Sequence, residues 1–466
     1  MSYIFDISNW DKDMYLFSYK ELNILMDVNS GAVHLIDDLT KKVLENLRYC
    51  EGNGEKVIEC LQESYPSSEI AEVMEELKNL KKAGLLFTED EPVDPFANRD
   101  TIIKSLCLHV AHDCNLRCRY CFGGTGDFGG TRKLMPLEVG QKAVDFLVAH
   151  SGKRPTVEVD FFGGEPLMNW QVVKELVFYG EAAAKRADKT IEFTITTNGV
   201  LLDPEKDAFI KEHKILLVLS IDGRPEVNDF MRPMTGGQGS YQRIVPRFQR
   251  ITESMDPKDY YVRGTFTHYN LDFAEDVKHL HDLGFTSLSV EPVVASENEA
   301  YALKPGDLPL IFSEYDRLVD LYLARKAEEK PFDFFHFNVD LEGGPCLPKR
   351  LTGCGAGFEY LAVTPEGDLY PCHQFVGRES YLLGDVWQGV VDKSISKKFM
   401  EAHIYNKESC KSCWARFLCS GGCHANADAN HGSILEPYEL GCQLQKKRLE
   451  CAIYLYCVNQ TNREQE

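Results

Sequence analysis

CNLRCRYC, residues 114–121, places Cys114, Cys118 and Cys121 in a C-x3-C-x2-C run. Three thiolates this close along the chain can hold three irons of a [4Fe–4S] cluster, which leaves the fourth iron without a protein ligand. Structural metal sites are closed by protein ligands, whereas a site that acts on a substrate keeps one position open. The run therefore predicts a cluster that binds a small molecule and passes it an electron.

The chain around this run alternates apolar strands with helical patterns. Strands are expected near residues 103–110, 157–162, 191–196, 215–221, 261–267 and 286–292. Continuous apolar strands separated by helices are typical of a parallel sheet with helices over its outer face. Six repeats are fewer than the eight of a closed barrel, so the sequence predicts an α/β fold with a partial (β/α)6 barrel over residues 101–330. Ligands of such sheets bind at the carboxyl ends of the strands, and the cysteine run follows the first strand.

Polar and glycine-rich motifs stand at the ends of the next three strands. In chain order they supply Gly163, Gly164, Glu165, Thr197, Asn198, Ser220 and Asp222, and Arg232 follows shortly after. Glycines let another group approach the backbone, and a carboxylate can pair with an amino group. Each motif alone is compatible with an ordinary polar strand end, but their recurrence at successive strands predicts one shared binding site.

The bulk composition indicates a soluble globular protein with more than one domain. The chain has 466 residues, of which 44% are hydrophobic and 26% charged, and this length exceeds one ordinary core. The net charge of −21 disfavours the nucleic acid backbone as a partner. The apolar runs are too short to span a membrane and the N-terminal residues lack a signal-peptide pattern, so we expect no membrane partner and a cytoplasmic location.

The C-terminal third, residues 331–466, is rich in cysteine and poor in periodicity. Ten of the sixteen cysteines lie between Cys346 and Cys457, and in a reducing compartment this favours ligation over disulfides. The cysteines with ligand-like spacing are Cys354, Cys372, Cys410, Cys413, Cys419, Cys423 and Cys442. Iron–sulfur clusters and zinc both fit such spacing. We expect this segment to build little apolar core and to draw folding energy from bound clusters.

Residues 1–90 form a separate unit in the sequence, followed by a linker over residues 91–100. Strands are expected within residues 14–36, helices at 39–50, 55–64 and 68–84, and a last short strand at 84–87. This order suggests a winged helix. The unit is acidic, which argues against DNA and leaves a peptide-binding element or a dimerisation or cap domain as alternatives.

The cysteine run and the strand-end motifs together resemble the radical S-adenosylmethionine (SAM) enzymes. The resemblance implies that Cys114, Cys118 and Cys121 hold the cluster whose open iron binds SAM. It implies that the Gly163–Gly164–Glu165 motif grips the amino group of SAM. The other SAM contacts that it implies, around the adenine, the ribose and the carboxylate, are Tyr120, Phe122, Thr197, Asn198, Ser220, Asp222 and Arg232.

The tail resembles the SPASM domain, which in its relatives holds two auxiliary [4Fe–4S] clusters. The resemblance assigns the distal cluster to Cys410, Cys413, Cys419 and Cys442. It assigns the nearer cluster to Cys354, Cys372 and Cys423. Cys346 stands where some relatives supply a fourth ligand to the nearer cluster. If Cys346 does not ligate, that cluster keeps an open iron for a substrate thiolate.

The whole chain resembles radical SAM/SPASM peptide maturases, most of all those that act on the six-cysteine (SCIFF) peptides. The resemblance implies three clusters, SAM, an external low-potential electron donor and a cysteine-rich precursor peptide whose leader adds as a strand to the N-terminal unit. It implies thioether cross-links between a cysteine sulfur and a carbon of another residue. The alternatives are oxidation of a seryl or cysteinyl side chain to a formylglycine-type aldehyde, or a zinc-binding peptide scaffold. Sulfatase-maturating relatives carry an aspartate proposed as general base where this chain has His373, which weakens the first alternative, although histidine can itself be a base.

Overall fold

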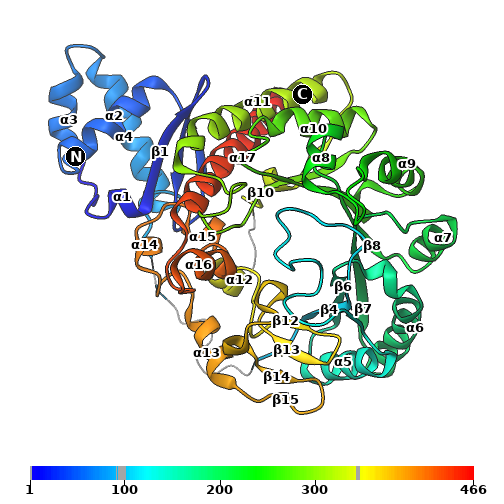
Figure 1. Ribbon diagram of the computed structural model, residues 1–466. Coiled ribbons are helices and arrows are strands. Elements are labelled where there is room, and N and C mark those ends of the chain that lie inside the picture. The colour runs from blue at the N-terminus through cyan, green and yellow to red at the C-terminus, as the bar shows by residue number, and fades with distance from the viewer. Residues whose placement is uncertain (1–2, 91, 93–100, 343–346, 466) are drawn as a thin grey trace.

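The computed structural model describes residues 3–90, 92, 101–342 and 347–465 and confirms the partial α/β barrel (Figure 1). Its parallel strands are β4 (Ser105–His112), β6 (Thr156–Gly163), β7 (Thr190–Thr197), β8 (Leu216–Ser220), β9 (Tyr260–Phe266) and β10 (Ser287–Pro292). These six strands are neighbours in chain order, and β11 (Asp333–Phe334) continues the sheet in parallel beyond β10. Each of the six predicted strands is therefore present.

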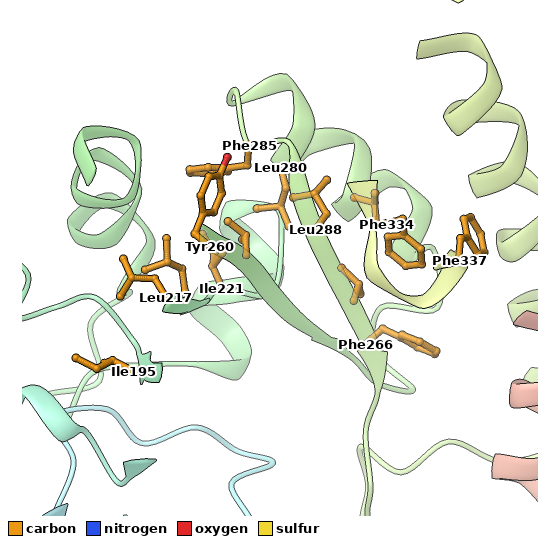
Figure 2. Close-up of a cluster of buried hydrophobic side chains, with 14 of the residues drawn as sticks. Ile195, Leu217, Ile221, Tyr260, Phe266, Leu280, Phe285, Leu288, Phe334 and Phe337 are labelled. Atoms are coloured by element: carbon orange, nitrogen blue, oxygen red, sulfur yellow. The ribbon is translucent and has the colours of Figure 1, made fainter. Parts of the chain in front are cut away.

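Helices cover the outer face of this sheet (Figure 1). They are α5 (Leu137–His150), α6 (Trp170–Arg186), α7 (Pro204–Glu212), α8 (Pro225–Met231), α9 (Tyr241–Thr252), α10 (Phe273–Asp282) and α11 (Leu308–Ala327). Strand residues such as Leu217 and Leu288 are fully buried against apolar residues of the helices and the loops after them, among them Leu280 and Phe285. Figure 2 shows part of this layer between the strands and the outer helices. None of the helices in the described chain combines the length and the apolar composition that a bilayer crossing requires.

The tail extends the barrel sheet from the opposite edge. Strand β12 (Tyr360–Val363) pairs in parallel with β4, and β13 (Asp368–Tyr370), β14 (Gly384–Asp385) and β15 (Gly389–Val390) follow as antiparallel strands. The tail helices are α12 (Leu347–Thr352), α13 (Lys393–Glu401), α14 (Glu408–Lys411), α15 (Arg416–Cys419), α16 (His424–His431) and α17 (Glu439–Gln465). The expectation of little apolar core here is wrong, because tail residues including Phe375 and Phe399 form a buried cluster and β12 and α17 join the barrel core.

The N-terminal domain combines a small antiparallel sheet with helices. Its elements are α1 (Trp10–Asp13), β1 (Met14–Tyr19), β2 (Leu22–Asp27), β3 (Val33–Ile36), α2 (Asp38–Tyr49), α3 (Gly54–Leu61) and α4 (Ser67–Lys82). The predicted strand at 84–87 is wrong, because these residues form a turn that buries Leu86 and leaves Phe87 with a positive φ of 54°. Residues 91 and 93–100 of the expected linker lie outside the described residues.

Helix α17 and the buried Arg416 join the N-terminal domain to the rest of the chain. On α17, Glu450 accepts a hydrogen bond from Tyr15 of β1. The Arg416 guanidinium is fully buried and donates to the Lys12 carbonyl at 2.7 Å, to Asn29 Oδ1 at 2.6 Å and to Asp13 Oδ1 at 3.0 Å. The segment between two tail cysteines, Cys413 and Cys419, is thereby fixed to the N-terminal domain.

We expect Arg416→Met to lower the free energy of unfolding by about 3–5 kcal/mol, because it leaves the Asp13 carboxylate buried without its cation. Urea unfolding of the full chain measures this change. Arg48→Met is the control, since Arg48 pairs with Asp11 at the surface and its loss should cost about 1 kcal/mol or less. Equal effects of the two substitutions would contradict a structural role for Arg416.

Candidate active site

A cavity of about 540 Å³ lies at the carboxyl ends of the barrel strands, between the strand ends and the tail. This volume suits a cofactor or small substrate. Predicted site residues that line it are Cys114, Cys118, Tyr120, Cys121, Phe122, Gly163, Gly164, Thr197, Asn198, Ser220, Arg232, His373, Cys419, Cys423 and Cys442. Residues far apart in the sequence, from the barrel and from the tail, thus line one cavity.

The cysteine run forms a loop held by backbone hydrogen bonds to the last residue of α8 and to the segment after it. The Arg117 amide donates to the Pro233 carbonyl at 2.8 Å, and the Arg119 amide to the Met231 carbonyl at 2.9 Å. Within the loop, the Leu116 amide points at the Cys114 sulfur at 3.4 Å. Because these bonds use main-chain groups, they fix the cysteine positions whatever side chains lie between them.

Gly163 and Gly164 allow the end of β6 to pack against the chain that enters the cysteine loop. A Cβ on Gly164 would lie 2.2 Å from the Asp113 carbonyl oxygen, and one on Gly163 would lie 2.3 Å from the Ala111 oxygen. Gly163 also has a φ of +121°, which other residues rarely adopt. The glycines therefore admit another stretch of this chain's backbone, and their exposed faces line the cavity as well.

Glu165 lies behind the cavity wall. Its carboxylate is fully buried and accepts hydrogen bonds from Thr197 Oγ1 at 2.7 Å, from the Asn198 amide at 2.8 Å and from the Leu167 amide at 3.0 Å. Burial raises the pKa of this carboxyl despite these donors. Asn198 in turn donates to Asn115 at 2.8 Å, so Glu165 links the end of β7 to the cysteine loop.

Asp222 holds the far side of the same loop. Its buried carboxylate accepts from the Tyr120 hydroxyl at 2.8 Å and from the Thr265 amide at 3.0 Å, and Arg232 donates to the Tyr120 oxygen at 2.9 Å. Burial raises the pKa of Asp222 to about 6, against the lowering effect of Arg232. Arg232 Nε is buried and has no hydrogen-bond partner among the described residues.

An aromatic wall separates the cysteine loop from the tail. Phe122 is 47% exposed and lies with its ring centroid 5.4 Å from His373, which also contacts Phe162 at 5.0 Å. His373 Nδ1 is 3.1 Å from the Tyr360 hydroxyl. Burial lowers the pKa of His373 to about 4, so the ring is neutral at neutral pH.

Sequence reasoning missed a charged group on the opposite wall. Arg263 of β9 and Glu291 of β10 form an ion pair at 2.6 Å. Burial alone would raise the pKa of Glu291, but Arg263 lowers it to about 2. Arg448 of α17 donates to His336 Nδ1 at 3.0 Å, which leaves the His336 proton on Nε2. These four residues are scattered singly over the sequence, and no local pattern there marks them.

The tail cysteines fall into two groups by their electrostatic neighbours. Besides burial, the pKa of Cys442 is raised to about 12 by Cys419, Cys410 and Cys413. Burial and then Cys423 and Cys354 raise the pKa of Cys372. The structure thus brings together the same two sets that the SPASM resemblance groups. Cys346 lies outside the described residues.

Burial also raises the pKa values of the first cysteine set, Cys114, Cys118 and Cys121. Burial, more than any neighbouring charge, raises the pKa of Cys114 to about 12 and that of Cys118 to about 11, and Cys121 adds to both shifts. These thiols are therefore protonated at neutral pH until a metal or cluster binds, and binding must release their protons.

Two domain matches cover these two parts of the chain. Residues 108–283 match the Radical SAM superfamily, and residues 354–414 match the SPASM iron–sulfur cluster-binding domain. The chain carries a radical SAM domain and a SPASM domain. The first match contains the cysteine loop and strands β6 to β9, and the second contains the segment that pairs with β4.

Two curated relatives match most of the chain. The chain is 23% identical over 350 residues to a cysteine-type anaerobic sulfatase-maturating enzyme of Clostridium novyi, which covers 70% of this chain and 90% of the relative. It is 21% identical over 374 residues to the radical SAM cyclopropyl synthase TigE of Paramaledivibacter caminithermalis, covering 74% of this chain and 72% of the relative.

Solved structures agree on the fold. Native anSMEcpe with bound AdoMet superposes with a TM-score of 0.64 at 22% identity, covering 77% of this chain and 99% of that one. SuiB of Streptococcus suis bound to S-adenosylmethionine superposes with a TM-score of 0.52 at 17% identity and covers 93% of this chain and 99% of that one.

The residues present fit the SAM and [4Fe–4S] groups that these domains imply. Among the described residues, no three His, Cys, Asp or Glu side chains converge closely enough to hold a single metal ion. A cube of four irons carries each of its ligands on a different corner, so it accepts thiolates spread more widely than one ion does. Sets made of cysteines alone are the donor chemistry of such clusters, and members of each set, Cys114, Cys118 and Cys121 of the first and Cys419, Cys423 and Cys442 of the tail sets, line the cavity.

We expect Gly164→Ala to displace the Asp113–Cys114 backbone and to reduce the iron bound after anaerobic reconstitution by the content of one cluster, with a stability loss of about 1–3 kcal/mol. Gly306→Ala is the control, because a Cβ there meets nothing within 4 Å. Iron analysis and thermal unfolding measure both variants. Full iron content in Gly164→Ala would show that the loop tolerates the displacement.

Proposed function

We propose that this protein is a radical SAM peptide maturase that joins a cysteine sulfur to a carbon of another residue in a ribosomally made precursor peptide. The observation that carries the proposal is the shared cavity. Its lining combines the cysteine loop, within the radical SAM match, with His373 of the SPASM match and with Cys423 beyond that match. A reacting carbon beside the first cluster and a thiol beside the second would therefore lie within one cavity.

In this proposal Cys114, Cys118 and Cys121 hold the SAM-binding cluster, and the cavity-lining residues near it hold SAM. When bound, these groups would supply a one-electron cleavage that starts hydrogen abstraction, and the auxiliary clusters would accept the surplus electron. Arg232 and Ser220 face the cavity as donors for a carboxylate and hydroxyls, and Phe122 offers an exposed ring to the adenine. Glu165 and Asp222 position this wall from behind.

The substrate side of the cavity is the SPASM wall. Cys354, Cys372 and Cys423 would hold the nearer auxiliary cluster. Its fourth ligand would be either Cys346 or a substrate thiolate. Cys410, Cys413, Cys419 and Cys442 would hold the distal one. The neutral His373 ring faces the cavity beside Cys372 and is the candidate acceptor for the substrate thiol proton. With a pKa of about 4 it would pass that proton on to solvent and not retain it. The peptide would lose a hydrogen atom from carbon and a proton from sulfur as the carbon–sulfur bond forms.

The N-terminal domain offers a docking place for the leader peptide. A groove of about 500 Å³ runs along β1, an edge strand of its sheet, and is lined by Tyr15 to Ser18 and by Lys41, Glu45 and Arg48 of α2. An edge strand beside a helix can accept an extended peptide as an added strand, whose side chains then enter the groove. Trp414 of the tail also lines the groove and stacks on Tyr15, with ring centroids 3.9 Å apart.

The second candidate is oxidation of a seryl or cysteinyl side chain to an aldehyde. The sulfatase-maturating relatives favour it, and they resemble this chain as closely as the cyclopropyl synthase does. The presence of His373, in place of the aspartate that those relatives are expected to carry, favours the thioether. Both reactions would use the same cavity and the same SAM wall.

Anaerobic reconstitution with iron, sulfide, SAM, a strong reductant and a cysteine-rich precursor peptide tests the proposal. We expect each thioether to remove two hydrogens from the peptide mass and one thiol from alkylation, with no product that reacts with an aldehyde-trapping reagent. An aldehyde adduct would instead establish the second candidate.

Replacing Cys114, Cys118 and Cys121 with alanine should abolish SAM cleavage, because no protein ligand would remain for the first cluster. Cys451→Ala is the matched control, since Cys451 is buried in α17 and contacts Tyr19 away from the cavity. Cleavage of SAM by the triple variant, measured by chromatography, would remove the first cluster from this site.

We expect Phe17→Asp to weaken binding of a fluorescent leader peptide about tenfold or more, because an added strand would bury the new charge. Tyr49→Asp is the control, since Tyr49 is 84% exposed and lies outside the groove. Fluorescence anisotropy with the full chain measures both. Unchanged affinity in Phe17→Asp would place the leader elsewhere.

A further inference from the structure

Lys407 is a fully buried lysine beside the tail cysteines. It stands directly before α14, the short helix that carries Cys410, and the Cys410 amide donates to the Lys407 carbonyl at 2.9 Å. Its ammonium donates to the Gly421 carbonyl at 2.8 Å. Gly421 lies between Cys419 and Cys423, so one side chain connects the helix of one cysteine to the loop between two others.

The ammonium has no carboxylate partner among the described residues, and the Gly421 bond is its one hydrogen bond there. A buried ammonium without a counter-charge is costly, and the charged form of a buried lysine is stable only where opposite charge compensates it. The electrostatic neighbours of Lys407 are the sulfurs of Cys410, Cys419, Cys423 and Cys442. Thiolates that ligate a cluster would provide the missing negative charge.

We propose that the Lys407 ammonium raises the reduction potential of the auxiliary cluster held by Cys410, Cys413, Cys419 and Cys442. The inference rests on the proposed function, which supplies that cluster. A cluster gains one negative charge on reduction, and a fixed cation in a low-dielectric site stabilises the more negative state. Net charge and hydrogen bonds near the sulfurs are the levers by which proteins set such potentials.

The position of Lys407 would direct an electron from the nearer auxiliary cluster to the distal one. Three of its four sulfur neighbours belong to the distal set, and the fourth, Cys423, belongs to the nearer set and lines the cavity. An electron that leaves the substrate through the nearer cluster would then move toward the cluster with the stronger positive field. Lys407 would thus act through the potential of the distal cluster and would not touch the substrate.

The test is a redox titration followed by electron paramagnetic resonance on the reconstituted full chain, with Cys114, Cys118 and Cys121 replaced by alanine so that only auxiliary clusters contribute. We expect Lys407→Met to shift one auxiliary signal to a lower midpoint potential, and Lys407→Arg to keep the potential of the parent. Lys411→Met is the matched control, because Lys411 lies on α14, the helix that Lys407 precedes, but is half exposed and paired with Glu408. Its potential should stay unchanged.

A Lys407→Met chain that binds full iron and titrates at the parent potential would overturn the inference while leaving the proposed clusters in place. A parent chain whose tail binds no cluster would instead overturn the auxiliary-cluster part of the proposed function.

If Lys407→Met binds iron poorly, thermal unfolding of the loaded and iron-free chains tests the inference instead. If the ammonium is compensated by the cluster, the substitution should reduce the stabilisation gained on loading and leave the iron-free chain no less stable. A loss of stability in the iron-free chain equal to that in the loaded chain would show a merely structural lysine.

Discussion

Strand β4 is hydrogen-bonded on both of its edges, and this double pairing organises the site. On one edge it pairs with β6 of the barrel, and on the other with β12 of the tail, both in parallel. The chain leaves β4 into the cysteine loop, leaves β6 into the Gly163–Gly164 turn, and reaches Cys372 directly after the hairpin of β12 and β13. One continuous sheet therefore determines how the two cysteine-bearing domains face each other.

Buried acids near the cavity act mainly on the architecture. The carboxylates of Glu165 and Asp222 are saturated with donors from neighbouring strand ends and from Tyr120. Because removing a partner from such a group leaves a buried charge unsatisfied, each acid forces two or three strand ends to keep their relative positions. Two reacting atoms must be held in a precise relative position. The buried acids and their donors supply this precision from behind the cavity-lining residues that would touch a ligand.

The sequence was sufficient for the features that recur periodically. The six barrel strands follow from apolar runs, and the first cysteine set follows from its C-x3-C-x2-C spacing, because both are local in the chain. The division of the tail cysteines into two sets is not local and came from the SPASM resemblance. Three kinds of feature could not be predicted. The tail core depends on partners in the barrel, as with Leu361 beside β4. The Arg263–Glu291 and His336–Arg448 contacts join residues without any pattern. The turn at 84–87 has a strand-like composition, but Leu86 packs into the N-terminal core without a strand neighbour.

The charges of the cavity differ in sign from those of the chain as a whole. The protein carries a net charge of −21, yet the cavity lining contains Arg232, Arg263 and Arg448 and, as its only carboxylate among the described lining residues, Glu291. Glu291 neutralises one guanidinium, and the Asp222 and Glu165 carboxylates behind the wall both act on Arg232. The positive excess therefore belongs to the lining itself, with the acids one layer back, and it suits a site that holds anionic clusters and the carboxylate of a cofactor, because buried anions are stable only with compensating cations nearby. The acidic surface sets the overall charge, while these arginines and the buried Lys407 set the field where electrons would enter and leave.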